Sequence, residues 1–179
     1  MKIVLGSLII FSLIISSFGN SDKLSDDNLS FDAKAGSNLV TEEDSGGIVL
    51  SNGLIQLKFY NVRSGFGLYS LSNVKTGYDF LLGATKESNL WNIEFKHSSN
   101  RLMYIDNTIE CNRTHKIERS ADGSNLTLHL YWNDIALETE EKVINVHATV
   151  RLDKSSLSYW QISVDNKRKR FGTWEITYP

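Results

Sequence analysis

The stretch from Gly46 to Leu82, GGIVLSNGLIQLKFYNVRSGFGLYSLSNVKTGYDFLL, alternates short apolar runs with glycine-centred turns. Asn52-Gly53 separates two apolar runs, which is a strong hairpin signal and predicts a type I′ turn with positive φ at both residues. Between residues 54 and 60 every second side chain is apolar, as in an antiparallel strand with one buried face. Further turns are expected around Gly65 and at Thr76-Gly77. The stretch therefore predicts three or four short antiparallel strands.

The same alternation continues through the rest of the chain. Apolar side chains recur at every second position around Trp91, Trp132 and Trp160 and throughout residues 143–152. Many short strands with turns at roughly ten-residue spacing are typical of a sandwich. No helical period of useful length appears, although residues 133–142 could hold a helical turn, an irregular loop or a strand. We therefore predict an all-β fold, an antiparallel β-sandwich, with the three tryptophans in its core.

Length and composition agree with one globular domain. The chain has 179 residues, of which 41% are hydrophobic and 22% charged, so it can bury a substantial core. A formal net charge of −2 gives no reason to expect a nucleic-acid partner. The single cysteine, Cys111, excludes an intrachain disulfide and a multi-cysteine metal site, and we interpret it as a small buried or edge residue. We predict no cofactor and no metal.

The N-terminal residues have the pattern of an export signal. Residues 1–19 combine Lys2, an apolar run that is short for a membrane span, and small residues at a cleavage point. We predict a signal peptide, with an uncleaved anchor as the alternative, and hence a secreted protein, extracellular or periplasmic, without membrane attachment after cleavage. Residues 20–45 are polar and predict a flexible linker, although a short strand near Leu39-Val40 could pair at the sheet edge. The sandwich is expected to span residues 46–179.

Two segments resemble a known family. NGLIQLKF, followed by LYSLSNVKTGYDFLL, resembles the opening of the N-terminal β-sandwich of secreted bacterial glycoside hydrolases, a domain of the galactose-mutarotase-like or supersandwich type. FGTWEITYP, at 171–179, is similar to the strand that ends such a domain just before the catalytic barrel. The resemblance covers about residues 46–179. It implies a domain without catalytic carboxylates, because in the family these lie in the barrel.

This resemblance implies an accessory, carbohydrate-associated module with no turnover of its own, which would be either a truncated or split gene product or a free-standing module. Its expected partners are an oligosaccharide or polysaccharide and a catalytic barrel domain encoded elsewhere. Trp174, Ile176 and Tyr178 alternate in a predicted strand that ends at Pro179, which suggests that more chain normally follows. The alternatives are a mutarotase-like aldose epimerase and a structural or adhesin-like surface sandwich.

The candidate site residues lie on the polar faces of predicted strands. Aldose epimerases of this fold use two histidines and a glutamate as general acids and bases, and here His129 and His147 share outward faces with Tyr131 and Arg151. We prefer a solvated outer face to a catalytic site, and the histidine spacing gives no metal motif. Sugar-binding surfaces combine exposed aromatic rings with amide, carboxylate or guanidinium groups. The carbohydrate-binding candidates are therefore Tyr131, His129, His147, Arg151 and Tyr159.

Two further clusters are interpreted as surface charge. The run KRKR at 167–170 could hold a polyanion, but we expect it to form a hairpin tip. The carboxylates at 138–141, and the pair Asp106 and Glu110, are neighbours in sequence. Glycoside hydrolysis needs two carboxylates on opposite sides of a cleft, which such neighbours rarely provide.

Overall fold

The computed structural model describes residues 2–5, 39–61, 63, 65–81, 89–137, 144–167 and 170–178. Within these residues there are twelve β-strands, all paired antiparallel, and no α-helix. The predicted all-β antiparallel sandwich is confirmed. The predicted signal peptide at 1–19 and linker at 20–45 lie largely outside the described residues.

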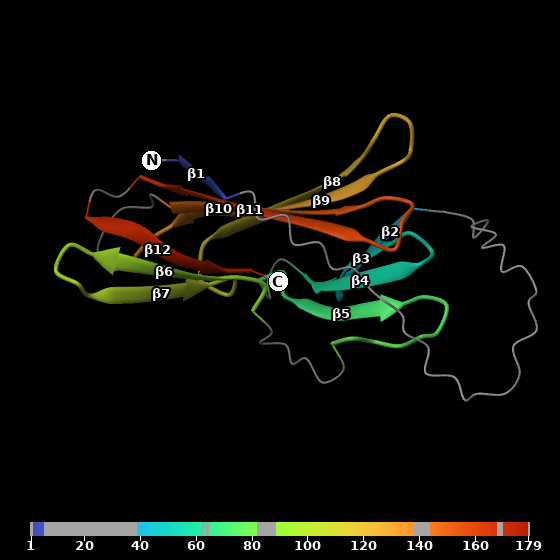
Figure 1. Cartoon of the computed structure of the whole chain (residues 1–179), viewed down its shortest axis with the longest axis horizontal. Coiled ribbons are helices and arrows are strands. Elements are labelled where there is room, and N and C mark those ends of the chain that lie inside the picture. The colour runs from blue at the N-terminus through green and yellow to red at the C-terminus, as the bar shows by residue number, and fades with distance from the viewer. Residues whose placement is uncertain are drawn as a thin grey trace, which may run out of the picture.

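The strands form three sheets in two layers (Figure 1). One layer is a five-stranded sheet in the order β1-β11-β10-β9-β8, formed by Lys2–Leu5, Ser158–Asn166, Ile144–Leu152, Leu126–Ile135 and Asn112–Arg119. The other layer holds a four-stranded sheet, β2-β3-β4-β5, formed by Val40–Glu43, Gly47–Ser51, Ile55–Tyr60 and Leu68–Asn73. Beside it lies a three-stranded sheet, β12-β6-β7, formed by Phe171–Thr177, Asn92–His97 and Leu102–Asp106 (Figure 1).

Strict alternation of side chains builds the core between the layers. In β4, β10 and β11 every second side chain is buried, and the polar side chains between them face outward. β9 follows the same rule from Leu126 to Trp132. β8, whose residues are mostly polar, lies at the edge of the large sheet.

Trp132 occupies the point where the three sheets meet. Its side chain is fully buried, and its ring packs edge-on against Phe66 at 5.6 Å and against Trp91 at 5.3 Å between ring centroids. Phe66 follows β4 and Trp91 precedes β6, so one side chain of the large sheet contacts segments that adjoin both sheets of the other layer. Trp91 and Trp160 are also buried, which confirms that the three tryptophans belong to the core.

The start of the sandwich lies earlier than position 46. Val40–Glu43 forms β2 and pairs with β3, so the short edge strand that the sequence allowed near Leu39-Val40 is present inside the segment interpreted as linker. For residues 133–142 the sequence allowed a helical turn, a loop or a strand. Residues 133–135 belong to β9, whereas 138–143 lie outside the described residues.

The hairpin at Asn52-Gly53 forms, but the prediction of a type I′ turn is wrong. Gly53 has a positive φ of 81°, whereas Asn52 does not. The Asn52 side chain is buried, and its Oδ1 atom accepts hydrogen bonds from the two backbone N–H groups that follow Gly53. Its Nδ2 group donates to the backbone carbonyls of Asp153 and Ser155. Asn52 therefore ties the β3–β4 turn to the β10–β11 turn, a role that no local pattern reveals.

A β-bulge changes the direction of one tryptophan. The alternation of Trp174 with Ile176 and Tyr178 predicted that the three share a face, but the register between β12 and β6 shifts between Thr173 and Glu175. Two residues of β12 then oppose one of β6, so Trp174 turns outward while Ile176 packs against the core. The predicted shared face is therefore wrong for Trp174.

Candidate functional site

The outer face of the large sheet carries the polar side chains of β8 to β11. Antiparallel pairing places Tyr131 of β9 directly opposite His147 of β10, while His129 lies opposite Thr149. His129 and His147 are therefore diagonal neighbours on the same face. Side chains in such positions can reach each other across a strand pair. The structure thus brings together three of the five candidate residues.

The three rings of this cluster lie almost parallel. The ring of Tyr131 stacks on that of His147, with centroids 4.4 Å apart and planes 5° from parallel. His129 Nδ1 lies 3.1 Å from His147 Nε2, so one imidazole donates a hydrogen bond to the other. All three side chains are half-buried. We call these residues, His129, Tyr131 and His147, the ring cluster.

A carboxylate extends the ring cluster towards the edge of the sheet. Glu118 of β8 places its Oε2 atom 3.5 Å from His129 Nε2, at the outer limit of a hydrogen bond. The other carboxylate oxygen lies 2.5 Å from Lys116 Nζ, and this contact with Lys116 lowers the pKa of Glu118. Glu118, His129 and His147 thus form a linear chain in which each group contacts the next.

Arg151 and Tyr159 lie on the same face but away from the ring cluster. The Arg151 guanidinium stacks over the Tyr159 ring, 4.4 Å from its centroid. Arg151 is four residues along β10 from His147, which separates them by roughly 13 Å in an extended strand. The structure therefore divides the five candidate residues into a cluster of three and a separate pair.

A pocket of about 290 Å³ adjoins the ring cluster. It crosses β9, β10 and β11, and Tyr131 and His147 form part of its wall. The other polar side chains that line it are Asn133, Asn145, Ser163 and Asp165. We call it the β9–β11 pocket. These four residues were not among the candidates predicted from the sequence, although they hold outward positions in alternating strands, a signal that becomes usable once the strand register is known.

Protonation of His147 should make stability depend on pH. Burial, and secondarily the neighbouring His129, lower the pKa of His147 below its usual 6.5. The unfolded chain then binds more protons than the folded chain just below that value, so the free energy of unfolding should fall as the pH drops through 6.5. In denaturant titrations, His147→Gln should flatten the dependence of the free energy of unfolding on pH between about pH 7.5 and about pH 5.5.

The matched control for this experiment is Thr149→Ala, which alters the same face of β10 without removing a titratable group. In Thr149→Ala, the free energy of unfolding should change with pH as steeply as in the parent protein. An unchanged slope in His147→Gln would contradict the burial that the structure assigns to this imidazole. The charged groups on the face, among them Glu118, Lys116, Arg151 and Asp165, remain in both variants.

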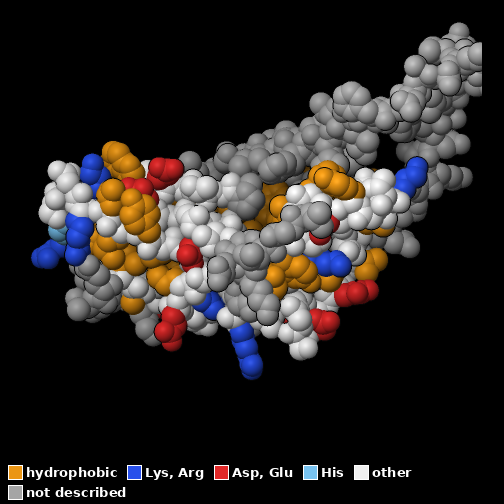
Figure 2. Space-filling view, turned by 90° about the horizontal axis from the view of Figure 1, so that it is seen from below, with side chains coloured by type: hydrophobic (Ala, Val, Ile, Leu, Met, Phe, Trp, Pro, Cys, Tyr) orange, Lys and Arg blue, Asp and Glu red, His pale blue; other side chains and the backbone are white. Residues whose placement is uncertain are grey.

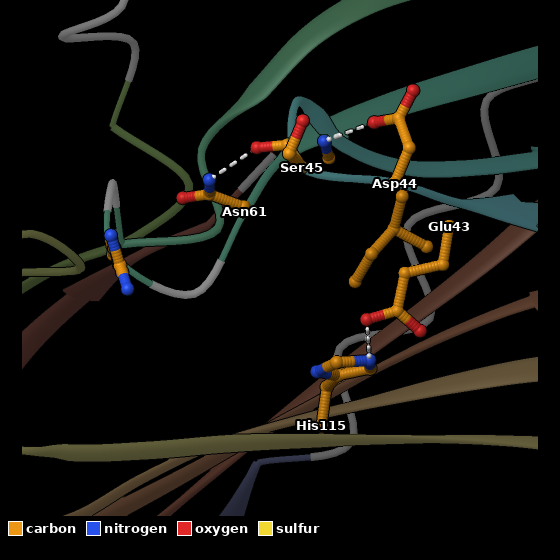
Figure 3. A pocket seen from close by; sticks show the side chains of 8 residues that line it. Glu43, Asp44, Ser45, Asn61 and His115 are labelled. Carbon is orange, nitrogen blue, oxygen red and sulfur yellow. Dashed lines mark hydrogen bonds and ion pairs between the residues drawn. The ribbon is translucent and has the colours of Figure 1, made fainter.

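A second pocket, of about 320 Å³, lies between the four-stranded sheet and β8 (Figure 3). Figure 3 shows His115 of β8 facing Glu43 of β2, with 3.0 Å between His115 Nε2 and Glu43 Oε1. On the other side Asn61 Nδ2 donates to the Ser45 carbonyl, and Asp44 Oδ1 accepts from two backbone N–H groups. Most of these polar groups thus bind each other and hold the β2–β3 turn. We therefore assign the pocket a structural role.

The remaining candidate features give no further candidate site within the described residues. Among the described residues, no group of three or more His, Cys, Asp or Glu side chains is arranged to hold a metal. Cys111 is half-buried, and burial raises the pKa of its thiol. The carboxylates at 138–141, and 168–169 within the basic run, lie outside the described residues. In the part of the chain that the structure describes, we find no helix with the length and apolar character that crossing a membrane requires.

Comparison with known proteins adds no relative. No family model matches the chain, and no curated protein is similar to it in sequence.

Proposed function

We propose that this chain is a non-catalytic carbohydrate-binding β-sandwich module. The observation that carries the proposal is the β9–β11 pocket, which is lined by the stacked rings of Tyr131 and His147 together with two amides, a hydroxyl and a carboxylate. Ligand pockets combine an apolar or aromatic wall with a few convergent polar groups that fix orientation. Sugars match this combination because their hydroxyl groups both donate and accept hydrogen bonds while their CH faces are apolar.

The charge of the pocket favours a neutral sugar over a strongly anionic one. Its charged side chain is Asp165, whose Oδ2 atom lies 3.7 Å from Lys167 Nζ. Asn133 and Asn145 each offer both donor and acceptor atoms, as sugar hydroxyl groups require. Asn145 Oδ1 also accepts a hydrogen bond from the Asp134 backbone N–H, which fixes its side chain at the pocket.

Hydrolysis is not part of this proposal. Glycoside hydrolases use two carboxylates on opposite sides of the bond to be cleaved. The described lining of the β9–β11 pocket contains one, Asp165. A catalytic barrel domain would supply the missing pair, so we propose that the module serves as the accessory N-terminal domain of a secreted glycoside hydrolase. The resemblance to the galactose-mutarotase-like domains supports this context.

A second candidate function is aldose epimerisation, which the chain of contacts from Glu118 through His129 to His147 favours. A general acid and a general base must, however, contact the substrate. Here the two imidazoles bind each other at 3.1 Å, which leaves no space for a sugar between them. We therefore rank epimerisation below binding.

The proposal is tested by applying the full chain to an array of neutral and anionic glycans and by assaying mutarotation of galactose and glucose on the same sample. Tyr131→Ala should weaken binding to the neutral glycans by about tenfold, because it removes the stacked wall of the pocket. Tyr78→Ala is the matched control, since Tyr78 is exposed in the turn after β5. It should leave the affinity unchanged.

Each outcome of this experiment decides between the candidates. Glycan binding without turnover supports the module if Tyr131→Ala weakens that binding. Turnover that is lost in His147→Ala would replace it with an epimerase. The absence of both binding and turnover would contradict both and favour a structural or adhesin-like surface role.

A further inference from the structure

The outer face of the β12-β6-β7 sheet exposes two aromatic side chains. Trp174 of β12 is 63% exposed and Tyr104 of β7 is 69% exposed. Leu102, two residues before Tyr104, is also exposed. Figure 2 shows hydrophobic side chains gathered at the end of the molecule that holds these strands. Exposed aromatic rings that cluster on one face mark interaction sites more often than scattered ones do.

The β-bulge in β12 creates this surface. Glu94 of β6 pairs with Tyr104 on one side and with Glu175 on the other. Trp174 is the extra residue of the bulge, next to Glu175. The two rings therefore lie on either side of β6, separated by two inter-strand spacings, or roughly 10 Å. A ligand that contacts both must be longer than one sugar ring.

Polar side chains fill the interval between the rings. Lys96 Nζ lies 4.2 Å from the centroid of the Trp174 ring. Desolvation, followed by the charge of Glu94 and its hydrogen bond with the phenol, raises the pKa of Tyr104. Asn92 and Asp106 form the next row of the same face. The surface thus presents two rings with carboxylate, ammonium and amide groups between and beside them.

This composition selects the kind of ligand. The centres of protein–protein interfaces are depleted of charged residues. On this surface, by contrast, Glu94 and Lys96 lie in the middle, between the two rings. In the paired rows between and beside the rings, Glu94, Glu175 and Asp106 outnumber Lys96, and these rows therefore disfavour an anionic ligand. A cation held by an aromatic cage needs its rings close together, whereas these lie on opposite sides of β6. An extended neutral ligand with apolar faces and hydroxyl edges fits all three constraints.

We propose that Trp174 and Tyr104 form a second carbohydrate-binding surface, specific for neutral oligosaccharides. It lies on the layer opposite the β9–β11 pocket, because the β12-β6-β7 sheet packs beneath the large sheet (Figure 1). The inference extends the proposed function, since both surfaces bind the same class of ligand. A module with binding surfaces on both layers can hold two polysaccharide chains at once, and the two contacts together strengthen attachment to an insoluble polymer.

The fluorescence of the protein offers a selective test. Trp174 is the exposed member of the four tryptophans, since Trp91, Trp132 and Trp160 are 1%, 0% and 4% exposed. Quenching by acrylamide therefore reports mainly on Trp174. Saturating neutral oligosaccharides of glucose, xylose, mannose and galactose, applied separately to the full chain, should include at least one that protects this tryptophan. Polygalacturonate, the anionic probe, should not protect it.

Affinity measurements on variants complete the test. Trp174→Ala and Tyr104→Ala should each weaken binding at this surface by about tenfold, while Trp174→Phe should retain most of it because it keeps an aromatic ring. Tyr78→Ala is the control for an exposed tyrosine elsewhere and should bind normally. Tyr131→Ala should leave the protection of Trp174 intact, because Tyr131 lies on the other layer.

The results separate this inference from the proposed function. Binding that depends on Tyr131 but is unchanged in Trp174→Ala and Tyr104→Ala would overturn the second surface and leave the first. A change in oligomeric state in Trp174→Ala, without an effect on sugar affinity, would make this face a protein interface and would also overturn it. If no saccharide binds the protein and none protects Trp174, both the proposed function and the second surface are overturned.

Discussion

Trp132→Ala should lower the free energy of unfolding by about 3–5 kcal/mol. The substitution removes a fully buried indole that packs on Phe66 and Trp91, and so leaves a cavity between all three sheets. It also removes the hydrogen bond from Trp132 Nε1 to the Asn107 carbonyl, 2.8 Å long. Denaturant titration followed by circular dichroism measures the change.

Trp174→Ala is the matched control for this loss. It removes the same side chain from an exposed position, and it should change the free energy of unfolding by less than about 0.5 kcal/mol. Equal effects in the two variants would contradict the position of Trp132 at the junction of the sheets.

Asn107→Ala should lower the free energy of unfolding by about 2–4 kcal/mol, because it leaves two buried backbone groups without partners. Asn107 is buried just after β7; its Oδ1 atom accepts from the Leu90 N–H at 2.7 Å, and its Nδ2 group donates to the Gly65 carbonyl at 3.0 Å. Gly65 has a positive φ of 77°, and a Cβ atom there would lie 2.5 Å from the Asn107 carbonyl oxygen. Asn107 therefore connects the β4–β5 turn to the β12-β6-β7 sheet.

Asn112→Ala provides the comparison for Asn107→Ala, since Asn112 is exposed at the start of β8. Its effect on the free energy of unfolding should stay below about 0.5 kcal/mol. A small loss in Asn107→Ala would mean that water replaces the Asn107 amide, and the tie between the sheets would then be dispensable.

The fold class was predictable because β-strands with one buried face alternate at every second position, and several segments between Ile55 and Val164 do so. The division into three sheets was not predictable, since pairing between β12 and β6 joins segments far apart in the chain. Asn52 and Asn107 look like ordinary turn residues, yet each binds backbone groups distant in sequence. Their burial depends on tertiary structure that a local pattern does not contain.

The candidate site was predictable only in part. Alternation placed His129, Tyr131 and His147 on outward faces, and the strand register then brought them into contact. The same alternation grouped Arg151 with them, but distance along β10 separates it. Trp174 was assigned to the wrong face because a β-bulge leaves no clear mark in the sequence. The exposed Trp174 surface therefore emerges from the structure alone.

We expect a carbohydrate to bind at the β9–β11 pocket. Backbone amide chemical shifts, measured while the full chain is titrated with the tightest neutral glycan, test this claim. We expect the largest changes in β9, β10 and β11 around Tyr131, Asn145 and Ser163, and their loss in Tyr131→Ala. Additional changes in β12 and β7 would reflect the second surface. Shifts that leave β9 to β11 unaffected at saturating glycan would contradict the claim.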